Sequence, residues 1–118
     1  MVINNDNTSN DAEYDELMDD LKNHDRMYAS MNELNAVISQ SNMRAPDVSK
    51  AGAYGSWHYD WNGGVNDSNN ELIMVEVRVN HDGSFNYCEC WNDRTINHNN
   101  VDIAYIINSL TCIGFKNE

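Results

Sequence analysis

The sequence has few basic residues and no long apolar run. Lys and Arg number 7 against 19 Asp and Glu, which gives a formal net charge of -12 at pH 7. A surface this acidic repels phosphate groups, so we expect no direct binding of nucleic acid or of an anionic membrane. No stretch approaches the roughly 20 apolar residues that span a bilayer, and the N-terminus lacks a basic segment followed by an apolar one. We therefore expect neither a membrane span nor a signal peptide.

The shortage of lysine contrasts with an abundance of asparagine. The chain contains 20 Asn residues but only three Lys, at Lys22, Lys50 and Lys116. AT-rich coding usually enriches both residue types together, so base composition alone does not explain this contrast. The bias indicates selection for negative charge, which favours and steers a partner with a basic surface.

The three cysteines, Cys88, Cys90 and Cys112, are an odd number that forms no paired disulfide framework. We expect reduced thiols in a cytoplasmic protein. Cys88 and Cys90 share a face if they lie in a strand, and we interpret them as small core residues. A structural zinc site usually needs two close ligand pairs and only this one exists, so we predict no metal and no cofactor. No catalytic motif surrounds a cysteine, and a small thiol enzyme is an alternative that the sequence does not favour.

An N-terminal helix is predicted from Asn10, a good capping residue, to about Ser41, because apolar residues recur between them at helical spacing. A second capping signature leaves open whether this segment is one helix or a pair with a break near Ala29. Residues 1–9 are polar and are predicted to be a flexible terminus, which leaves 10–118 as a single domain.

Three strands are predicted in the middle of the chain, around residues 57–61, 71–79 and 84–91. Each shows the period-two alternation that places one set of side chains on one face. In the second strand Ile73 shares a face with the three valines that follow it, while Leu72 starts the opposite face. The sequence does not decide which of these two faces is buried.

The segments 42–56 and 62–70 are predicted to be loops because they collect Gly, Pro, Asn and Ser. A C-terminal helix is predicted from about Asn100 to Ile113, with Asn99 or Asn100 as its cap. Helices packed on one face of a small three-stranded antiparallel meander form an α+β domain, and this is the fold class that we predict.

The acidic residues are concentrated before the first predicted strand. Residues 1–25 hold eight Asp and Glu and a single base, Lys22. Asp15 and Asp19 are four residues apart on the predicted helix, where like charges destabilise it by roughly 0.2–0.5 kcal/mol. Their presence beside Asp20 indicates that the negative face has a use, since carboxylates accept Arg hydrogen bonds much as phosphates do. We predict that Asp15, Asp19 and Asp20 bind a basic partner.

A strand that runs into an Asn-x-Asp-Gly turn ends at Gly83, with the sequence VRVNHDG. Together with the return strand and the C-terminal helix, residues 71–110 resemble the small acidic anti-CRISPR proteins of phages, which inhibit type II RNA-guided DNA nucleases. The resemblance implies an α-βββ-α fold and a hairpin that occupies the Arg residues with which the nuclease reads its protospacer-adjacent motif. It further implies that Asp82 accepts hydrogen bonds from Arg of the nuclease and that Asn80 adds a polar contact to the same partner. Gly83 is then the residue that holds the turn.

These observations predict a non-enzymatic inhibitor, encoded by a phage or other mobile element, that acts in the host bacterial cytoplasm. It would occupy the basic DNA-binding site of a defence nuclease, first of all a CRISPR effector, as an acidic DNA mimic. Two alternatives share the same electrostatics: an immunity or antitoxin protein that caps a basic toxin, and a DNA mimic that blocks a restriction enzyme. The sequence predicts no oligomeric state.

Overall fold

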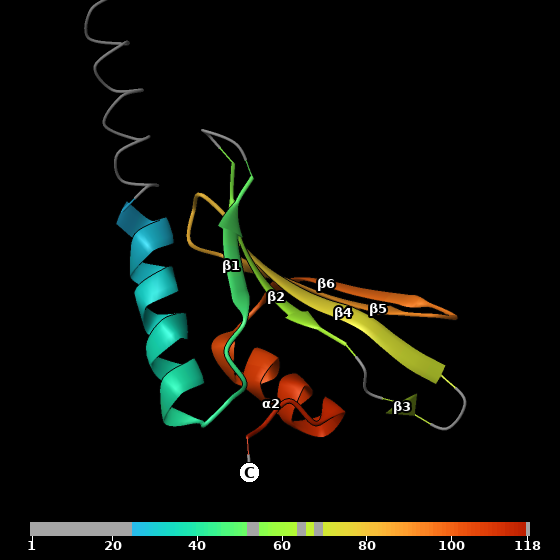
Figure 1. Ribbon diagram of the computed structural model, residues 1–118. Helices are drawn as coiled ribbons and strands as arrows, with labels where there is room; N and C mark the ends of the chain where they lie inside the picture. The colour runs from blue at the N-terminus through green and yellow to red at the C-terminus, as the bar shows by residue number, and fades with distance from the viewer. Residues whose placement is uncertain (1–24, 52–54, 64–65, 68–69, 118) are drawn as a thin grey trace, which may run out of the picture.

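A computed structural model describes residues 25–51, 55–63, 66–67 and 70–117. It shows two helices packed on a five-stranded antiparallel sheet, so the predicted α+β class is confirmed (Figure 1). The predicted flexible terminus and the first part of the predicted N-terminal helix lie outside the described residues.

The N-terminal helix is described from residue 25 to residue 40 and has no break at Ala29. Ser30, which belongs to the second capping signature, starts no new helix and instead donates from Oγ to the Gly83 carbonyl at 2.7 Å. The helix ends near Ser41, as predicted. Its buried side chains recur every three or four residues and face the sheet: Met27, Met31, Leu34 and Ile38.

The sheet has the strand order β1-β2-β4-β5-β6, and all neighbouring strands are antiparallel. A two-residue strand, β3, pairs with the start of β4. The predicted meander forms the centre of this sheet, as β2, β4 and β5. The strands are β1 Asp47–Lys50, β2 Trp57–Asn62, β3 Asn66–Asp67, β4 Asn70–Val79, β5 Phe85–Trp91 and β6 Thr95–Val101.

The prediction of only three strands is wrong at both edges of the sheet. The segment 42–56, expected to be a loop, contains β1, and the expected loop 62–70 contains β3. β6 follows directly after β5, where no strand was expected. All four residues of β1 and five of the seven in β6 are exposed, so neither strand shows the apolar alternation by which strands are predicted.

β4 contains a β-bulge at Ile73. Leu72 lies opposite Trp91 and Met74 lies opposite Cys90, so the register shifts by one residue between them. Because successive side chains alternate, the extra residue moves the core-facing positions from even to odd numbers. Leu72 and the three later valines are therefore all buried, whereas Ile73 is 57% exposed. The expectation that Ile73 shares a face with those valines is wrong.

The C-terminal helix, α2, spans Ile103–Ile113 and begins three residues later than predicted. The expected caps, Asn99 and Asn100, lie in β6, and Asp102 takes their place: its Oδ1 accepts a backbone N–H of the first helical turn at 2.8 Å. Gly114 ends the helix in a left-handed conformation. In the described ranges, no helix is long and apolar enough to cross a membrane.

Both helices pack on the same face of the sheet, and the core lies between the two layers (Figure 1). Two aromatic residues of β2 are buried there with their polar atoms satisfied. Tyr59 donates from its hydroxyl to Asn35 Oδ1 at 2.7 Å, and Trp61 donates from Nε1 to the Arg44 carbonyl at 2.7 Å. Both residues therefore belong to the core.

The segments that follow the two helices are joined to each other. Met43 and Lys116 form an isolated antiparallel bridge, and Arg44 N–H donates to the Phe115 carbonyl at 2.8 Å. The Arg44 guanidinium also lies 4.3 Å from the centroid of the Phe115 ring. This contact connects the end of the N-terminal helix to the end of α2.

Candidate functional site

The predicted contact residues of the hairpin lie together in the turn between β4 and β5. Gly83 N–H donates to the Asn80 carbonyl at 2.9 Å, and Asn80 N–H donates to the Ser84 carbonyl at 2.9 Å. Gly83 has a φ of 88°, so the loop is a type I turn followed by a left-handed residue. Glycine adopts this φ without strain, and Gly83 therefore holds the turn.

Asp82 is exposed, and its carboxylate is fixed by a neighbour in the turn. Its Oδ1 accepts from Ser84 Oγ at 2.6 Å and from Ser84 N–H at 3.0 Å, and these bonds lower the pKa of the Asp82 carboxyl. Asn80 donates from Nδ2 to Ser84 Oγ at 3.0 Å. The turn thus presents an oriented, negatively charged carboxylate, while the Asn80 amide is engaged within it.

The same turn contacts the N-terminal helix. A Cβ added at Gly83 would lie 2.9 Å from Ser30 Oγ and 3.0 Å from the Arg26 carbonyl oxygen. The close approach therefore requires glycine for a second reason, besides its φ. The structure brings the three predicted hairpin residues together. The other predicted contact residues lie outside the described part of the chain: Asp15, Asp19 and Asp20.

The sheet face opposite the helices carries polar side chains in two rows, and we call it the open face. Residues directly opposite each other in antiparallel strands share a face, so the strand registers define these rows. Sequence analysis missed this surface, although the polar residues that alternate with core residues in β2 and β4 were a signal for it. The rows are Asp47, Asp60, Glu76, Cys88 and Asn97, and Ser49, His58, Arg78, Asn86 and Asn99.

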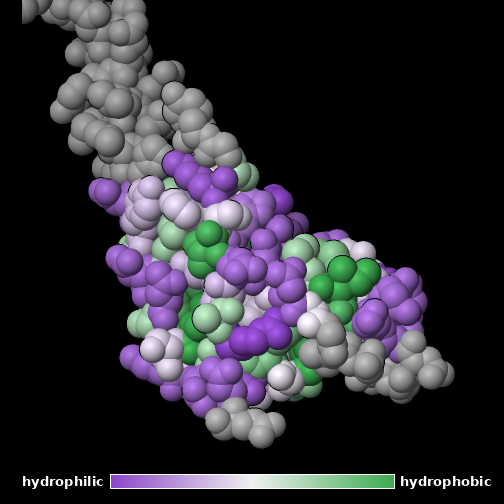
Figure 2. All heavy atoms as spheres, viewed as in Figure 1, coloured by the Kyte–Doolittle hydropathy of each residue, from purple (hydrophilic) through white to green (hydrophobic). Residues whose placement is uncertain are grey.

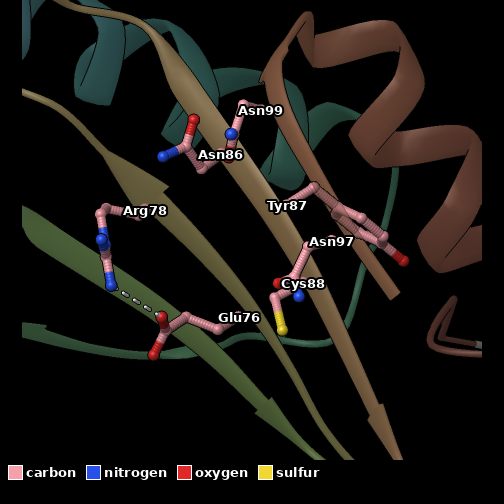
Figure 3. A pocket seen from close by; sticks show the side chains of 7 residues that line it. All are labelled: Glu76, Arg78, Asn86, Tyr87, Cys88, Asn97 and Asn99. Carbon is pink, nitrogen blue, oxygen red and sulfur yellow. Dashed lines mark ion pairs between the residues drawn. The ribbon is translucent and has the colours of Figure 1, made fainter. Parts of the chain in front are cut away.

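Glu76 is the electrostatic centre of the open face. His58 Nδ1 lies 3.1 Å from Glu76 Oε1, and an Arg78 guanidinium nitrogen lies 3.8 Å from Glu76 Oε2 (Figure 3). Burial and then the neighbouring Glu76 raise the pKa of the Asp60 carboxyl. The Asp60 Oδ1 atom is buried with no hydrogen-bond partner among the described residues. Asp60 is therefore an unfavourably placed charge.

A hollow of about 200 Å³ lies on the open face between β4, β5 and β6. Tyr87 of β5 also borders it, but this ring packs on the helix side, edge-on to Tyr105 of α2 with ring centroids 5.4 Å apart. The lining combines amide and charged groups with apolar surface of similar extent, and it is large enough for water or a small polar group. Figure 3 shows the side chains that line it from the open face: Glu76, Arg78, Asn86, Cys88, Asn97 and Asn99.

The cysteine pair lies on the open face and not in the core, so its interpretation as small core residues is wrong. Cys88 and Cys90 are half-buried, with their Sγ atoms 3.8 Å apart. Burial and the neighbouring Cys90 raise the pKa of the Cys88 thiol to about 11, which keeps it protonated at neutral pH. Within the described part of the chain, no group of three or more His, Cys, Asp or Glu residues could hold a metal ion.

The face seen in Figure 2 is mostly hydrophilic, with separate hydrophobic patches. Among the residues that the structure describes, the exposed large apolar side chains come from four different elements: Tyr28, Val48, Ile73 and Tyr105. Scattered apolar residues of this kind are ordinary on a protein surface.

Comparison with protein-family models, with curated proteins and with solved structures finds no match for this chain.

Proposed function

We propose that the chain is a non-enzymatic inhibitor that binds the basic nucleic-acid-binding surface of a host defence nuclease and excludes DNA from it. The first candidate target is a type II CRISPR effector nuclease in the bacterial cytoplasm, and the inhibitor would be encoded by a phage or mobile element. The observation that carries the proposal is the placement of negative charge. Residues 1–24 hold seven Asp and Glu and one base, so about a fifth of the chain supplies half of the net charge of -12.

The described residues carry a smaller excess of negative charge for their number, with 11 acidic residues against six basic ones. Part of this charge is neutralised within the fold. Glu76 lies between His58 and Arg78, and Asp93 pairs with Arg94 at 2.9 Å. The negative charge that a basic partner would meet is therefore concentrated toward the N-terminus.

The β4–β5 turn lies beside the helix that follows the acidic segment. Gly83 contacts Ser30 and Arg26, and Arg26 is only six positions after Asp20 in the sequence. The acidic segment thus joins the fold at the end that carries Asp82. A fixed carboxylate at that end adds an oxygen, Asp82 Oδ2, that can accept a charge-assisted hydrogen bond from Arg, which supports one contact surface made of both parts.

The binding test is gel filtration of the purified chain with a guide-loaded type II nuclease, with and without target DNA bound beforehand. Co-elution only in the absence of DNA supports occlusion of the DNA-reading site. Co-elution regardless of DNA would replace DNA mimicry with binding at another surface. If the nuclease of the natural host forms no complex, the CRISPR target is wrong, and an adjacent toxin gene would then favour the antitoxin alternative.

Charge reversal identifies the residues that bind. The triple variant Asp15→Lys, Asp19→Lys, Asp20→Lys and the single variant Asp82→Lys should each weaken inhibition of DNA cleavage by about tenfold or more, because like charges then face the basic site. The measurement is the concentration for half-maximal inhibition, with circular dichroism to confirm folding.

The matched control is Asp93→Lys, in the turn at the other end of β5. It makes the same charge change, and it breaks only an exposed pair with Arg94 that contributes little to stability. Its effect on inhibition should stay below about twofold. A loss for Asp93→Lys equal to that for Asp82→Lys, which has the same charge change, would mean that net charge matters and that the position of Asp82 does not.

A further inference from the structure

β6 forms an edge of the sheet that is unpaired among the described strands (Figure 1). The sheet ends at β1 on one side and at β6 on the other. An edge strand exposes N–H and C=O groups that can pair with another strand, and proteins protect such edges with charge, proline or short length. The two edges of this sheet differ in that protection.

β1 carries several of these protections. It has four residues, begins with Asp47, ends with Lys50 and follows Pro46. β6 has seven residues and contains neither a charged residue nor proline. Charges occur only just outside it, in Asp93 and Arg94 before the strand and Asp102 after it. β6 is therefore the edge that is open to pairing.

The hydrogen-bond pattern tells which backbone groups of β6 face outward. Trp91 N–H donates to the Arg94 carbonyl at 2.8 Å and closes the β5–β6 hairpin. From this pair onward, opposite residues alternate between bonded and non-bonded pairs, and Cys90 with Thr95 is the first non-bonded one. The N–H and C=O groups of Thr95, Asn97 and Asn99 therefore point away from β5. They form a ladder of three residues for an added strand.

We propose that β6 pairs antiparallel with β6 of a second copy of this chain, so that two sheets join into one. The side chains that stand beside the outward backbone groups, Asn97 and Asn99, lie on the open face. An amide side chain has both a donor and an acceptor, so identical amides can bond to each other across a two-fold axis. If the two-fold axis passes through Asn97, this residue faces Asn97 of the second copy. If the axis passes through His98, Asn97 faces Asn99 of the second copy.

The lack of Asp, Glu, Lys and Arg in β6 and the apolar surface exposed beside it favour a second copy as the occupant. Two chains of charge -12 repel each other, but the uncharged β6 is a strip along which they can approach, and salt weakens the repulsion further. On the helix side, the ring of His98 packs on Tyr105 of α2 with centroids 5.4 Å apart, and Tyr105 remains 37% exposed. A second β6 would lie beside this ring and cover it.

The test is the oligomeric state of the purified chain by sedimentation velocity, at low salt and at about 0.5 M NaCl, up to about 500 µM chain. We expect a reversible dimer whose affinity increases with salt concentration. We also expect the backbone N–H groups of Asn97 and Asn99 to exchange hydrogen more slowly in the dimer than in the monomer. A monomer under all these conditions would overturn the proposal. So would a dimer in which these two amides exchange as fast as in the monomer.

Two variants with the same charge change separate this edge from others. Asn97→Lys places a cation on β6, and Ser49→Lys places one on the open face of β1. Each lowers the net negative charge equally, so a general electrostatic effect would strengthen both dimers. We expect Asn97→Lys to raise the dimer dissociation constant about tenfold or more and Ser49→Lys to leave it within about twofold. Equal behaviour of the two variants would contradict pairing through β6.

Discussion

Gly83 and Gly114 both have a positive φ, 88° and 114°, but they differ in what surrounds them. A Cβ at Gly114 would meet no heavy atom within 4 Å. At Gly83 the same atom would lie 2.9 Å from Ser30 Oγ and 3.0 Å from the Arg26 carbonyl oxygen. Gly114 is thus required by its backbone conformation alone, and Gly83 also by its contact with the helix.

Alanine substitutions should reproduce this difference. Gly114→Ala should lower the free energy of unfolding by roughly 1 kcal/mol, and Gly83→Ala by roughly 2–3 kcal/mol, because only the second adds a steric clash to the strained φ. Urea unfolding of both variants measures the two values. Equal losses would show that the helix moves away from the turn at no cost.

Asp60 and Asp82 are carboxylates with opposite effects on stability. The pKa of Asp60 is raised by burial and by Glu76, whereas hydrogen bonds from Ser84 lower the pKa of Asp82. A carboxyl with a raised pKa destabilises the fold when charged, and this penalty disappears as the pH falls through its folded pKa. A carboxyl with a lowered pKa stabilises the fold above its unfolded pKa, near 3.9, and that contribution is lost as the pH falls toward its folded pKa.

Replacement of each carboxylate by its amide should therefore shift stability in opposite directions. At pH 7, Asp60→Asn should raise the free energy of unfolding and Asp82→Asn should lower it. Both differences should fade as the pH falls and the wild-type carboxyls become protonated. Urea unfolding from pH 7 down to about pH 3 tests this. An Asp60→Asn variant that is less stable than the wild type at pH 7 would contradict the assignment.

Among the elements, β4 shows how one residue changes a whole strand. The bulge at Ile73 puts Leu72 in the core and leaves Ile73 57% exposed. Simple alternation along the sequence cannot show this, because the register shift depends on which residues of β5 lie opposite.

Alanine substitutions of Leu72 and Ile73 should destabilise the fold by different amounts. Leu72→Ala should lower the free energy of unfolding by roughly 2–4 kcal/mol, because it removes buried methyl groups, and Ile73→Ala by less than about 0.5 kcal/mol. Chemical denaturation of both variants is the measurement. A larger loss at Ile73 would mean that the strand is not bulged.

The central strands and the helices could be predicted because half of their side chains are buried, which leaves a periodic apolar pattern. The edge strands could not, since a strand such as β6, with three Asn residues and mostly exposed side chains, resembles a loop in sequence. The start of α2 was misplaced for the same reason, because asparagines that read as helix caps belong to that edge.

The candidate site was predictable only where it is local in sequence. The turn around Asp82 and Gly83 depends on a few adjacent residues, and the sequence is sufficient to place it. The rows of the open face depend on the registers of five strands, which no local pattern contains. Cys88 and Cys90 were placed in the core, although Phe85 and Tyr87, at odd positions, already occupied the core side of the same strand.

At the scale of the whole molecule, the described helices lie on one side of the sheet, and the two proposed interfaces are made of different residues. The β4–β5 turn, which carries Asp82, lies where the N-terminal helix contacts Gly83. The β6 edge is separated from β4 by the width of β5. The turn nevertheless adjoins one end of β6, because Phe85, three residues after Asp82, lies opposite Val101. The two interfaces use different residues, so separate variants test them.

The bridge between Met43 and Lys116 has a consequence for biosynthesis. Asn42 and Asn117, which stand beside this bridge and are also hydrogen-bonded to each other, are 75 positions apart in the sequence. During translation the N-terminal helix emerges long before the residues that secure its end. The nascent chain therefore keeps Met43, Arg44 and their neighbours without these partners until the last turn of α2 has left the ribosome. Closure of the fold by these contacts is therefore a late step in the synthesis of the domain.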